Sequence, residues 1–420
     1  MAHFPRLIEL TTEQDRRSIR YRKLSPLNWF LKQNLPPFIV EHRATLKILV
    51  LNVSQSQALT DATMACSQLE SLTTRHPCMG NNQDLEDWMN WYESLAVRLK
   101  SLSFIDMSMV SNNIDSIMDD AMDGLLSKTR ESTLQRLQLQ SEGISLTSLR
   151  VLMLLIMKSP ELRHLSLAIL HDKGAITRLA EAVEKTQRGL FCQKLESLSI
   201  QHGHFNLTEF KRVMDSLPAL KNLSLFGCGA SSSPIAPFLT TLNLRRLRVE
   251  GCPWASPTTI QDLLCSMPSL EVLAVNCVSD LAIQKDPRPW VCTELKELST
   301  AIEISLGLDG ITLILDRLAT LRRLETLNVQ RAYSFTTVDE INEYQDNDVN
   351  TRVHELPLML EWGLDRLETL TQLRVLGVDN GLTKWGKDEA HWALENWTHL
   401  ISLNVAADDE ARSLLLHRIP

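Results

Sequence analysis

The sequence has few cysteines and no long apolar run. Eight cysteines are spread over 420 residues, and no two of them form a CxxC pair. Zinc sites and disulfide frameworks need clustered cysteines, so this distribution indicates reduced, buried thiols. No stretch approaches the roughly 20 apolar residues that span a bilayer, and the first residues lack the features of a secretory signal. We therefore expect an intracellular protein, in the cytoplasm or nucleus, with no membrane partner.

An excess of positive charge is also missing. Lys and Arg number 43 against 51 Asp and Glu, which gives a formal net charge of −8. Binding to nucleic acid depends on clustered Lys and Arg, so the charge balance argues against a nucleic-acid partner. Hydrophobic residues make up 44% of the chain, which is enough to bury a large core.

Signatures of catalysis are absent as well. The chain has no GxSxG, HExxH, GxxxxGK(S/T) or GxGxxG motif, and no cysteine in a recognisable nucleophile context. His202 and His204 could ligate a metal, but no third and fourth ligand stand near them in the sequence. We expect no enzyme activity, no cofactor and no metal site.

One pattern, Leu-x-x-Leu-x-(Leu/Val/Ile/Phe), recurs from end to end. Its copies are Leu46/Leu49/Leu51, Leu99/Leu102/Phe104, Leu134/Leu137/Leu139, Leu162/Leu165/Leu167, Leu195/Leu198/Ile200, Leu220/Leu223/Leu225, Leu244/Leu247/Val249, Leu270/Leu273/Val275, Leu324/Leu327/Val329, Leu373/Leu376/Val378 and Leu400/Leu403/Val405. Weaker copies with Thr at the third anchor begin at Leu7, Leu69 and Leu295. Successive copies stand about 23 to 39 residues apart, except for about 49 between Leu324 and Leu373.

This spacing predicts one short strand for each copy. The second and third anchors stand two residues apart, so in extended chain they point to one face of a sheet. Between the strands the apolar period becomes helical. Asn206 and Ser256 are suited to be N-caps of two such helices, and Pro257 suits the first helical position.

No unit of this size can bury its own apolar face, so the copies must stack side by side. The sequence therefore predicts an α/β leucine-rich-repeat solenoid: a ribonuclease-inhibitor-like horseshoe with an inner parallel sheet and outer helices. We expect a single domain over residues 1–420, with about 13–14 repeats. The acidic, polar stretch near residues 333–355 is interpreted as an insertion.

Two turns have a form in which Cys replaces the usual Asn, LFGC at 225–228 and VEGC at 249–252. This form resembles the repeats of F-box/leucine-rich-repeat proteins. Three further features are similar to the large family of such proteins in early-diverging filamentous fungi: PWVCTELKEL at 289–298, WGLDRLETL at 362–370 followed by LRVL at 373–376, and a late signature at Glu389, Trp392 and Trp397.

The resemblance covers roughly Thr45 to Val405 and implies substrate capture for a ubiquitin ligase of the SCF type. In that family an F-box docks on the Skp adaptor and cullin, while the repeats select the protein to be ubiquitinated. No F-box pattern is found in this chain, and residues 4–10 already resemble a repeat strand. Adaptor and cullin are therefore expected partners only if an F-box exists upstream.

Two alternatives remain open. A stand-alone scaffold or inhibitor would bind a partner without sending it for degradation. A GTPase-activating repeat protein would need a catalytic Arg on a repeat loop and Asn-type repeats throughout.

The alternation along each strand also predicts a contact surface. Residues that flank the buried anchors should face the concave side of the sheet, where a protein partner would bind. In the middle of the array these contact residues are Ser199, Gln201, Asn222, Ser224, Phe226, Arg246, Arg248, Glu250 and Asn276. Ser197, Val272 and Ala274 occupy equivalent positions. Phe226, Arg246 and Arg248 are the strongest candidates, because arginine and aromatic side chains are enriched at binding hot spots.

Overall fold

Both halves of the chain are built from short parallel strands that pair in chain order. The computed structural model describes residues 9–12, 26–54, 57–75, 91–92, 94–95, 97–105, 132–141, 155–156, 158–169, 193–230, 235–330, 354–379 and 382–418. The chain forms two compact units, unit 1 over Met1–Leu220 and unit 2 over Lys221–Pro420. That residues 1–420 form a single domain stays a prediction.

Unit 1 contains one parallel sheet in the part that the structure describes. Its strands pair in the order β1 (Glu9–Thr12), β2 (Ile48–Ser54), β3 (Ser71–Arg75), β4 (Ser101–Ile105), β5 (Arg136–Ser141), β6 (His164–Ile169) and β7 (Ser197–Gln201). The helices described in this unit are α1 (Pro26–Glu41), α2 (Gln57–Ala65) and α7 (Leu207–Asp215), and β8 (His204–Phe205) is a very short strand.

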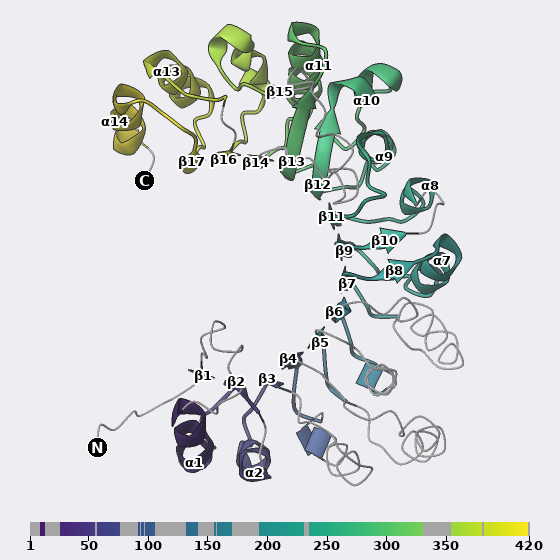
Figure 1. Cartoon of the computed structure of the whole chain (residues 1–420), viewed down its shortest axis with the longest axis vertical. Coiled ribbons are helices and arrows are strands. Elements are labelled where there is room, and N and C mark those ends of the chain that lie inside the picture. Colours follow the sequence, from purple (N-terminus) through teal and green to yellow (C-terminus); the bar gives the residue numbers. More distant parts are fainter. Residues whose placement is uncertain are drawn as a thin grey trace, which may run out of the picture. The chain divides into compact units, whose positions relative to one another are not determined.

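Unit 2 repeats the arrangement, with helices on one face of its sheet (Figure 1). Its parallel strands are β9 (Asn222–Phe226), β11 (Arg246–Glu250), β12 (Val272–Ser279), β13 (Glu297–Ile304), β14 (Thr326–Gln330), β16 (Val375–Val378) and β17 (Ser402–Asn404). The helices are α8 (Ala236–Leu239), α9 (Pro257–Leu264), α10 (Asp280–Lys285), α11 (Leu308–Ala319), α13 (Lys387–Asn396) and α14 (Asp409–Arg418), with 3-10 turns η2 (Leu360–Trp362) and η3 (Leu364–Thr369) and the short strand β10 (Gly229–Ala230).

Every strand that the repeat pattern predicts is present, and the predicted fold class, an α/β leucine-rich-repeat solenoid, is confirmed. The middle leucine of each copy lies opposite the middle leucine of the next. In unit 1 this ladder runs Leu10, Leu49, Leu72, Leu102, Leu137, Leu165, Leu198. In unit 2 it runs Leu223, Leu247, Leu273, Leu298, Leu327, Leu376, Leu403.

The ladder leucines form the core. From Leu49 to Leu198 and from Leu223 to Leu376 all of them are buried. Each buried leucine side chain stabilises the fold by about 1.5–3 kcal/mol relative to an exposed one. The weak copies that begin at Leu69 and Leu295 follow the same rule, because the threonines at their third anchors, Thr74 and Thr300, are buried too. The hydroxyl of Thr300 donates to the carbonyl of Ala301 at 2.8 Å, which offsets the cost of burying it.

The predicted helix starts are also confirmed. Asn206 caps α7 and accepts a hydrogen bond from the amide of Glu209 at 2.8 Å. Ser256 caps α9 in the same way, with Pro257 at the first helical position. Such caps satisfy amides that have no partner within the helix, which sets where each helix can begin.

The predicted insertion falls almost wholly outside the described residues. The structure describes the chain again at β15 (His354–Glu355), which pairs antiparallel with the end of β13. Among the helices that are described, none combines the length and the apolar character of a membrane span.

Replacing one ladder leucine should test the core directly. Leu247 is fully buried, so Leu247→Ala should lower the free energy of unfolding by about 2–5 kcal/mol. The neighbouring Arg246 is exposed on the same strand, and Arg246→Ala should change that free energy by less than about 0.5 kcal/mol. Equilibrium unfolding in urea compares the two variants. Similar losses from both would contradict the assigned faces of β11.

Candidate functional site

Strands β9 and β11 bring six of the predicted contact residues onto one face. We call the face of each sheet that bears the residues between the buried anchors the concave face. Asn222 lies opposite Arg246, Ser224 opposite Arg248, and Phe226 opposite Glu250. Phe226 is 43% exposed, and both arginines are exposed. Adjacent strands are about 4.8 Å apart, so these side chains can contact one partner together.

The two arginines differ in their surroundings. Arg248 forms an ion pair with Glu297 of β13, with 3.3 Å between nitrogen and oxygen. The guanidinium of Arg246 makes no hydrogen bond or ion pair with any residue that the structure describes. Arg246 is therefore the cation of this face that a partner can engage without breaking an existing pair.

Two expected contact positions on β12 are not accessible. Val272 and Ala274 are only 5% and 3% exposed, although they stand between the anchors of that strand. Strand β12 lies between β11 and β13, so the Arg248–Glu297 pair must cross it. The long arginine side chain covers the small β12 residues. The prediction that Val272 and Ala274 face a partner is corrected accordingly.

Asn276 is engaged with the backbone of the preceding repeat. Its Oδ1 accepts from the amide of Gly251 at 2.6 Å, and its Nδ2 donates to the carbonyl of Cys252 at 3.4 Å. Gly251 has a φ of +64°, which favours glycine because a side chain would strain this conformation. Both functional groups of the Asn276 amide thus stabilise a turn.

Cys228 and Cys252 occupy the equivalent turns and satisfy backbone groups there. The Sγ of Cys252 accepts from the amide of Cys228 at 3.3 Å, and its thiol lies 3.5 Å from the carbonyl of Leu225. The interaction with Cys228 and burial together raise the pKa of the Cys252 thiol. The interpretation of these cysteines as turn residues is confirmed.

Other thiols in unit 2 are poor nucleophiles. Burial, with a smaller effect of Glu303, raises the pKa of Cys277 to about 12. Burial raises the pKa of Cys292 to about 12 as well. Both thiols therefore stay protonated near neutral pH, and the thiolate is the reactive form. Within the described ranges no group of three or more His, Cys, Asp or Glu is arranged to bind a metal ion.

The remaining predicted contact residues, Ser199 and Gln201, are on the concave face of unit 1. Both are half-buried on β7, in alternation with the buried Leu198 and Ile200. The same alternation places two basic residues on neighbouring strands of this face, Arg136 and His164. The sequence analysis missed them because it named contact residues only for the middle of the array.

A row of charged residues just before the strands is neutralised within the chain. Glu70 pairs with Lys47 at 3.7 Å and with Lys100 at 2.8 Å. The hydrogen bond and charge of Lys100 hold the pKa of Glu70 below its usual range. In unit 2, Glu271 pairs with Arg245 and Lys296, both at 3.3 Å. Exposed pairs of this kind add little stability, but they cancel charge along this row.

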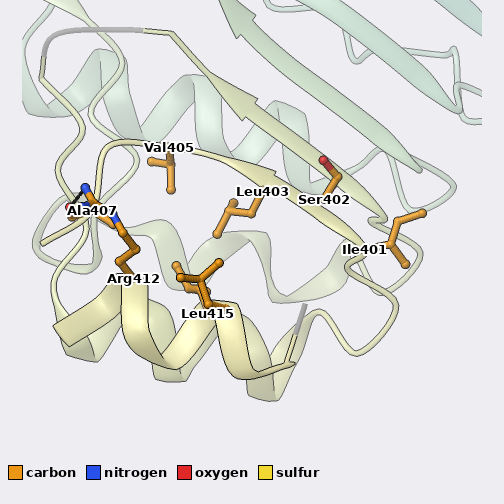
Figure 2. A pocket seen from close by; sticks show the side chains of 8 residues that line it. Ile401, Ser402, Leu403, Val405, Ala407, Arg412 and Leu415 are labelled. Atoms are coloured by element: carbon orange, nitrogen blue, oxygen red, sulfur yellow. Dashed lines mark hydrogen bonds between the residues drawn. The ribbon is translucent and has the colours of Figure 1, made fainter. Parts of the chain in front are cut away.

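A pocket of about 330 Å³ lies at the last described strand and helix, away from the predicted contact residues. It is lined by Ile401, Ser402, Leu403, Val405, Ala407, Arg412, Leu415 and Leu416. Figure 2 shows Leu403 and Val405 on the side of the strand that faces Leu415 and Arg412 of α14. Arg412 donates to the carbonyl of Ala407 at 3.1 Å. Leu403 is half-buried here, whereas Leu376, its neighbour in the ladder, is fully buried.

The residues that carry the family resemblance have structural roles. Trp290 is buried and donates to Oε1 of Gln261 at 2.9 Å. Trp397 is buried and donates to the carbonyl of Leu367 at 3.2 Å. Glu389 accepts from the amide of Gly386 at 2.9 Å. The side chains in these sequence segments therefore stabilise the packing of the repeats.

No family model and no curated protein matches the sequence. Among solved structures, the chain is similar to an internalin from Listeria monocytogenes, with 15% identity, a TM-score of 0.41, and coverage of 88% of this chain and 83% of the internalin chain. It is also similar to a chain of the mouse RP105/MD-1 complex, with 15% identity and a TM-score of 0.41. That alignment covers 90% of this chain and 54% of the other, so the chain spans about half of its length. Likeness at this level does not assign a function.

Replacing Asn276 should show whether its side chain stabilises the turn or only lies on the surface. Asn276→Ala removes both hydrogen bonds and leaves the Gly251 amide without its acceptor, so it should cost about 1–3 kcal/mol. Asn222→Ala, on the same face, should cost less than about 0.5 kcal/mol. Urea unfolding gives both values, and hydrogen exchange at the Gly251 amide should accelerate only in Asn276→Ala. An unchanged exchange rate would contradict the turn role.

Proposed function

We propose that this chain is a protein-binding scaffold that uses the concave face of its sheets. The observation that carries the proposal is that Phe226 and Arg246 share one face of adjacent strands: an aromatic side chain 43% exposed at the end of β9 and, at the start of β11, a guanidinium without a partner among the described residues. Arginine and aromatic residues dominate the binding energy of many protein interfaces. Around them, Asn222 and Ser224 offer adaptable hydrogen-bonding groups, as the rim of an interface does.

The backbone of this surface is rigid, which also supports the proposal. The side chains stand on paired strands whose opposite faces are buried, so binding requires little ordering of the chain. The negative net charge disfavours nucleic acid as the partner, and no catalytic chemistry is part of the proposal.

We infer, as the finer form of this function, that the scaffold selects substrates for an SCF-type ubiquitin ligase. The cysteine-type turns at Cys228 and Cys252 favour this form over a stand-alone scaffold or inhibitor, because they carry the resemblance to F-box/leucine-rich-repeat proteins. Affinity purification from the source organism, with the natural transcript, should then recover the Skp adaptor and cullin. If a different protein is recovered reproducibly without them, the stand-alone scaffold is the correct form.

The contact surface can be tested with one double variant. Phe226→Ala combined with Arg246→Glu removes the aromatic contact and reverses the free charge, so recovery of bound proteins should fall by about tenfold or more. The matched control is Glu209→Gln, on the outer helix α7, which should leave recovery unchanged. Quantitative mass spectrometry of the captured proteins compares the variants.

Unfolding in urea should show that the double variant keeps the stability of the parent chain, because both side chains are exposed. Undiminished recovery with a stable double variant would place the contact surface elsewhere.

A further inference from the structure

Part of the concave face of unit 1 bears only neutral or positive side chains. On β4, β5, β6 and β7 the anchors are buried, and the residues between them face the other way. At the described positions of this kind, serine and glutamine predominate and no carboxylate occurs on any of the four strands.

The basic side chains of this part of the face are Arg136 and His164. The two residues lie directly opposite each other on β5 and β6. Neither side chain makes a hydrogen bond or ion pair with another described residue. The nearest carboxylate that affects His164 belongs to Glu196, which already pairs with Arg163 at 3.1 Å. Arg136 and His164 are therefore adjacent basic side chains that form no ion pair with a described carboxylate.

The environment of His164 agrees with this geometry. Partial burial and the neighbouring Arg136 lower the pKa of the imidazole. An anion between the two side chains would oppose both effects, because it stabilises the imidazolium and screens the repulsion from Arg136.

Hydroxyl groups extend the pair on both sides. Ser101 lies opposite Arg136 on β4, and Ser197 lies opposite His164 on β7. The four side chains form one row across four strands, which spans about 14 Å. An extended segment of about five residues covers that distance. Hydroxyl, guanidinium and imidazole groups can all donate to carboxylate oxygens.

We propose that this row, Ser101, Arg136, His164 and Ser197, binds an extended acidic segment of a partner protein, with a carboxylate between Arg136 and His164. The inference deepens the proposed scaffold function by naming the chemistry of one partner segment. A nucleic acid would bring many phosphates to a face that offers two cations on an acidic chain, so the charge complementarity favours a short acidic peptide.

The test uses the full chain and a fluorescent peptide of alternating glutamate and glycine, with a glutamine–glycine peptide as the neutral control. Fluorescence anisotropy should show binding of the acidic peptide alone, weakened by added salt. Arg136→Gln combined with His164→Gln should lower the affinity by about tenfold, since it removes two charge-assisted contacts. Arg322→Gln, at an exposed arginine just before β14 and outside both proposed contact surfaces, is the matched control and should leave the affinity unchanged.

A pH series adds a readout that loss of folding would not imitate. Lowering the pH from about 8 to about 6 favours the imidazolium form of His164, which a bound carboxylate also stabilises, while glutamate stays ionised, so the affinity for the acidic peptide should rise. The charged groups around His164 are Arg136, Arg163 and Glu196. The rise should disappear in His164→Gln.

The inference is overturned if the acidic peptide fails to bind, if the double variant binds it as well as the parent chain, or if Arg322→Gln alone abolishes binding. Preferential binding of inorganic phosphate over the peptide would also overturn the choice of a carboxylate ligand. Failure of the acidic peptide to bind would not contradict the proposed scaffold function. It stands if proteins are still captured through Phe226 and Arg246 while the peptide fails.

Discussion

The constraint on which the structure depends is that a single repeat cannot bury its leucines alone. Each middle leucine is covered because the next strand brings another leucine opposite it, as Leu247 lies between Leu223 and Leu273. A slip of one residue would turn the whole strand and expose its anchors, so burial fixes the register. Once the register is fixed, the residues between the anchors must share the opposite face. The contact surface is thus a consequence of the core.

Stacking creates a second requirement, because the turn after each strand leaves backbone groups away from water. Asn276 satisfies the Gly251 amide of the preceding repeat, and Cys252 satisfies the Cys228 amide in the same way. A carboxamide and a thiol thus each accept from a turn amide across a repeat boundary, although Asn276 aligns with Glu250 and not with Cys252. The cysteine-type turns that suggest a family are therefore also a solution to a backbone problem, since a buried amide without an acceptor is costly. The same holds for Trp290 and Trp397, whose indole groups donate to neighbouring repeats.

The strands and helix caps could be predicted because they depend on local periodicity. Leu-x-x-Leu-x-Leu determines a strand face within six residues, and Asn206 or Ser256 determines a helix start within one turn. The contact surface was only partly predictable. Alternation placed Arg246 and Phe226 on the concave face, yet Val272 and Ala274 are covered by Arg248 and Glu297, which are far apart in the sequence. The Arg248–Glu297 pair depends on which strands are neighbours and on the length of the arginine side chain. Neither can be predicted from the period of the apolar residues. Arg136 and His164 could have been found by extending the same alternation to β5 and β6.

Charge has different roles on two neighbouring rows of the sheet. Just before the strands, opposite charges on successive repeats pair with one another, as Glu70 does with Lys47 and Lys100. On the concave face the cations Arg136 and Arg246 have no such partner among the described residues. If the charged residues served only solubility, a chain with net charge −8 would have ample carboxylates to pair with both. Intramolecular ion pairs such as Arg248–Glu297 cover the strand residues beneath them, so a partner cannot contact those residues. Arg136 and Arg246, which form no such ion pair, are therefore the residues of this face that can bind an opposite charge on a partner.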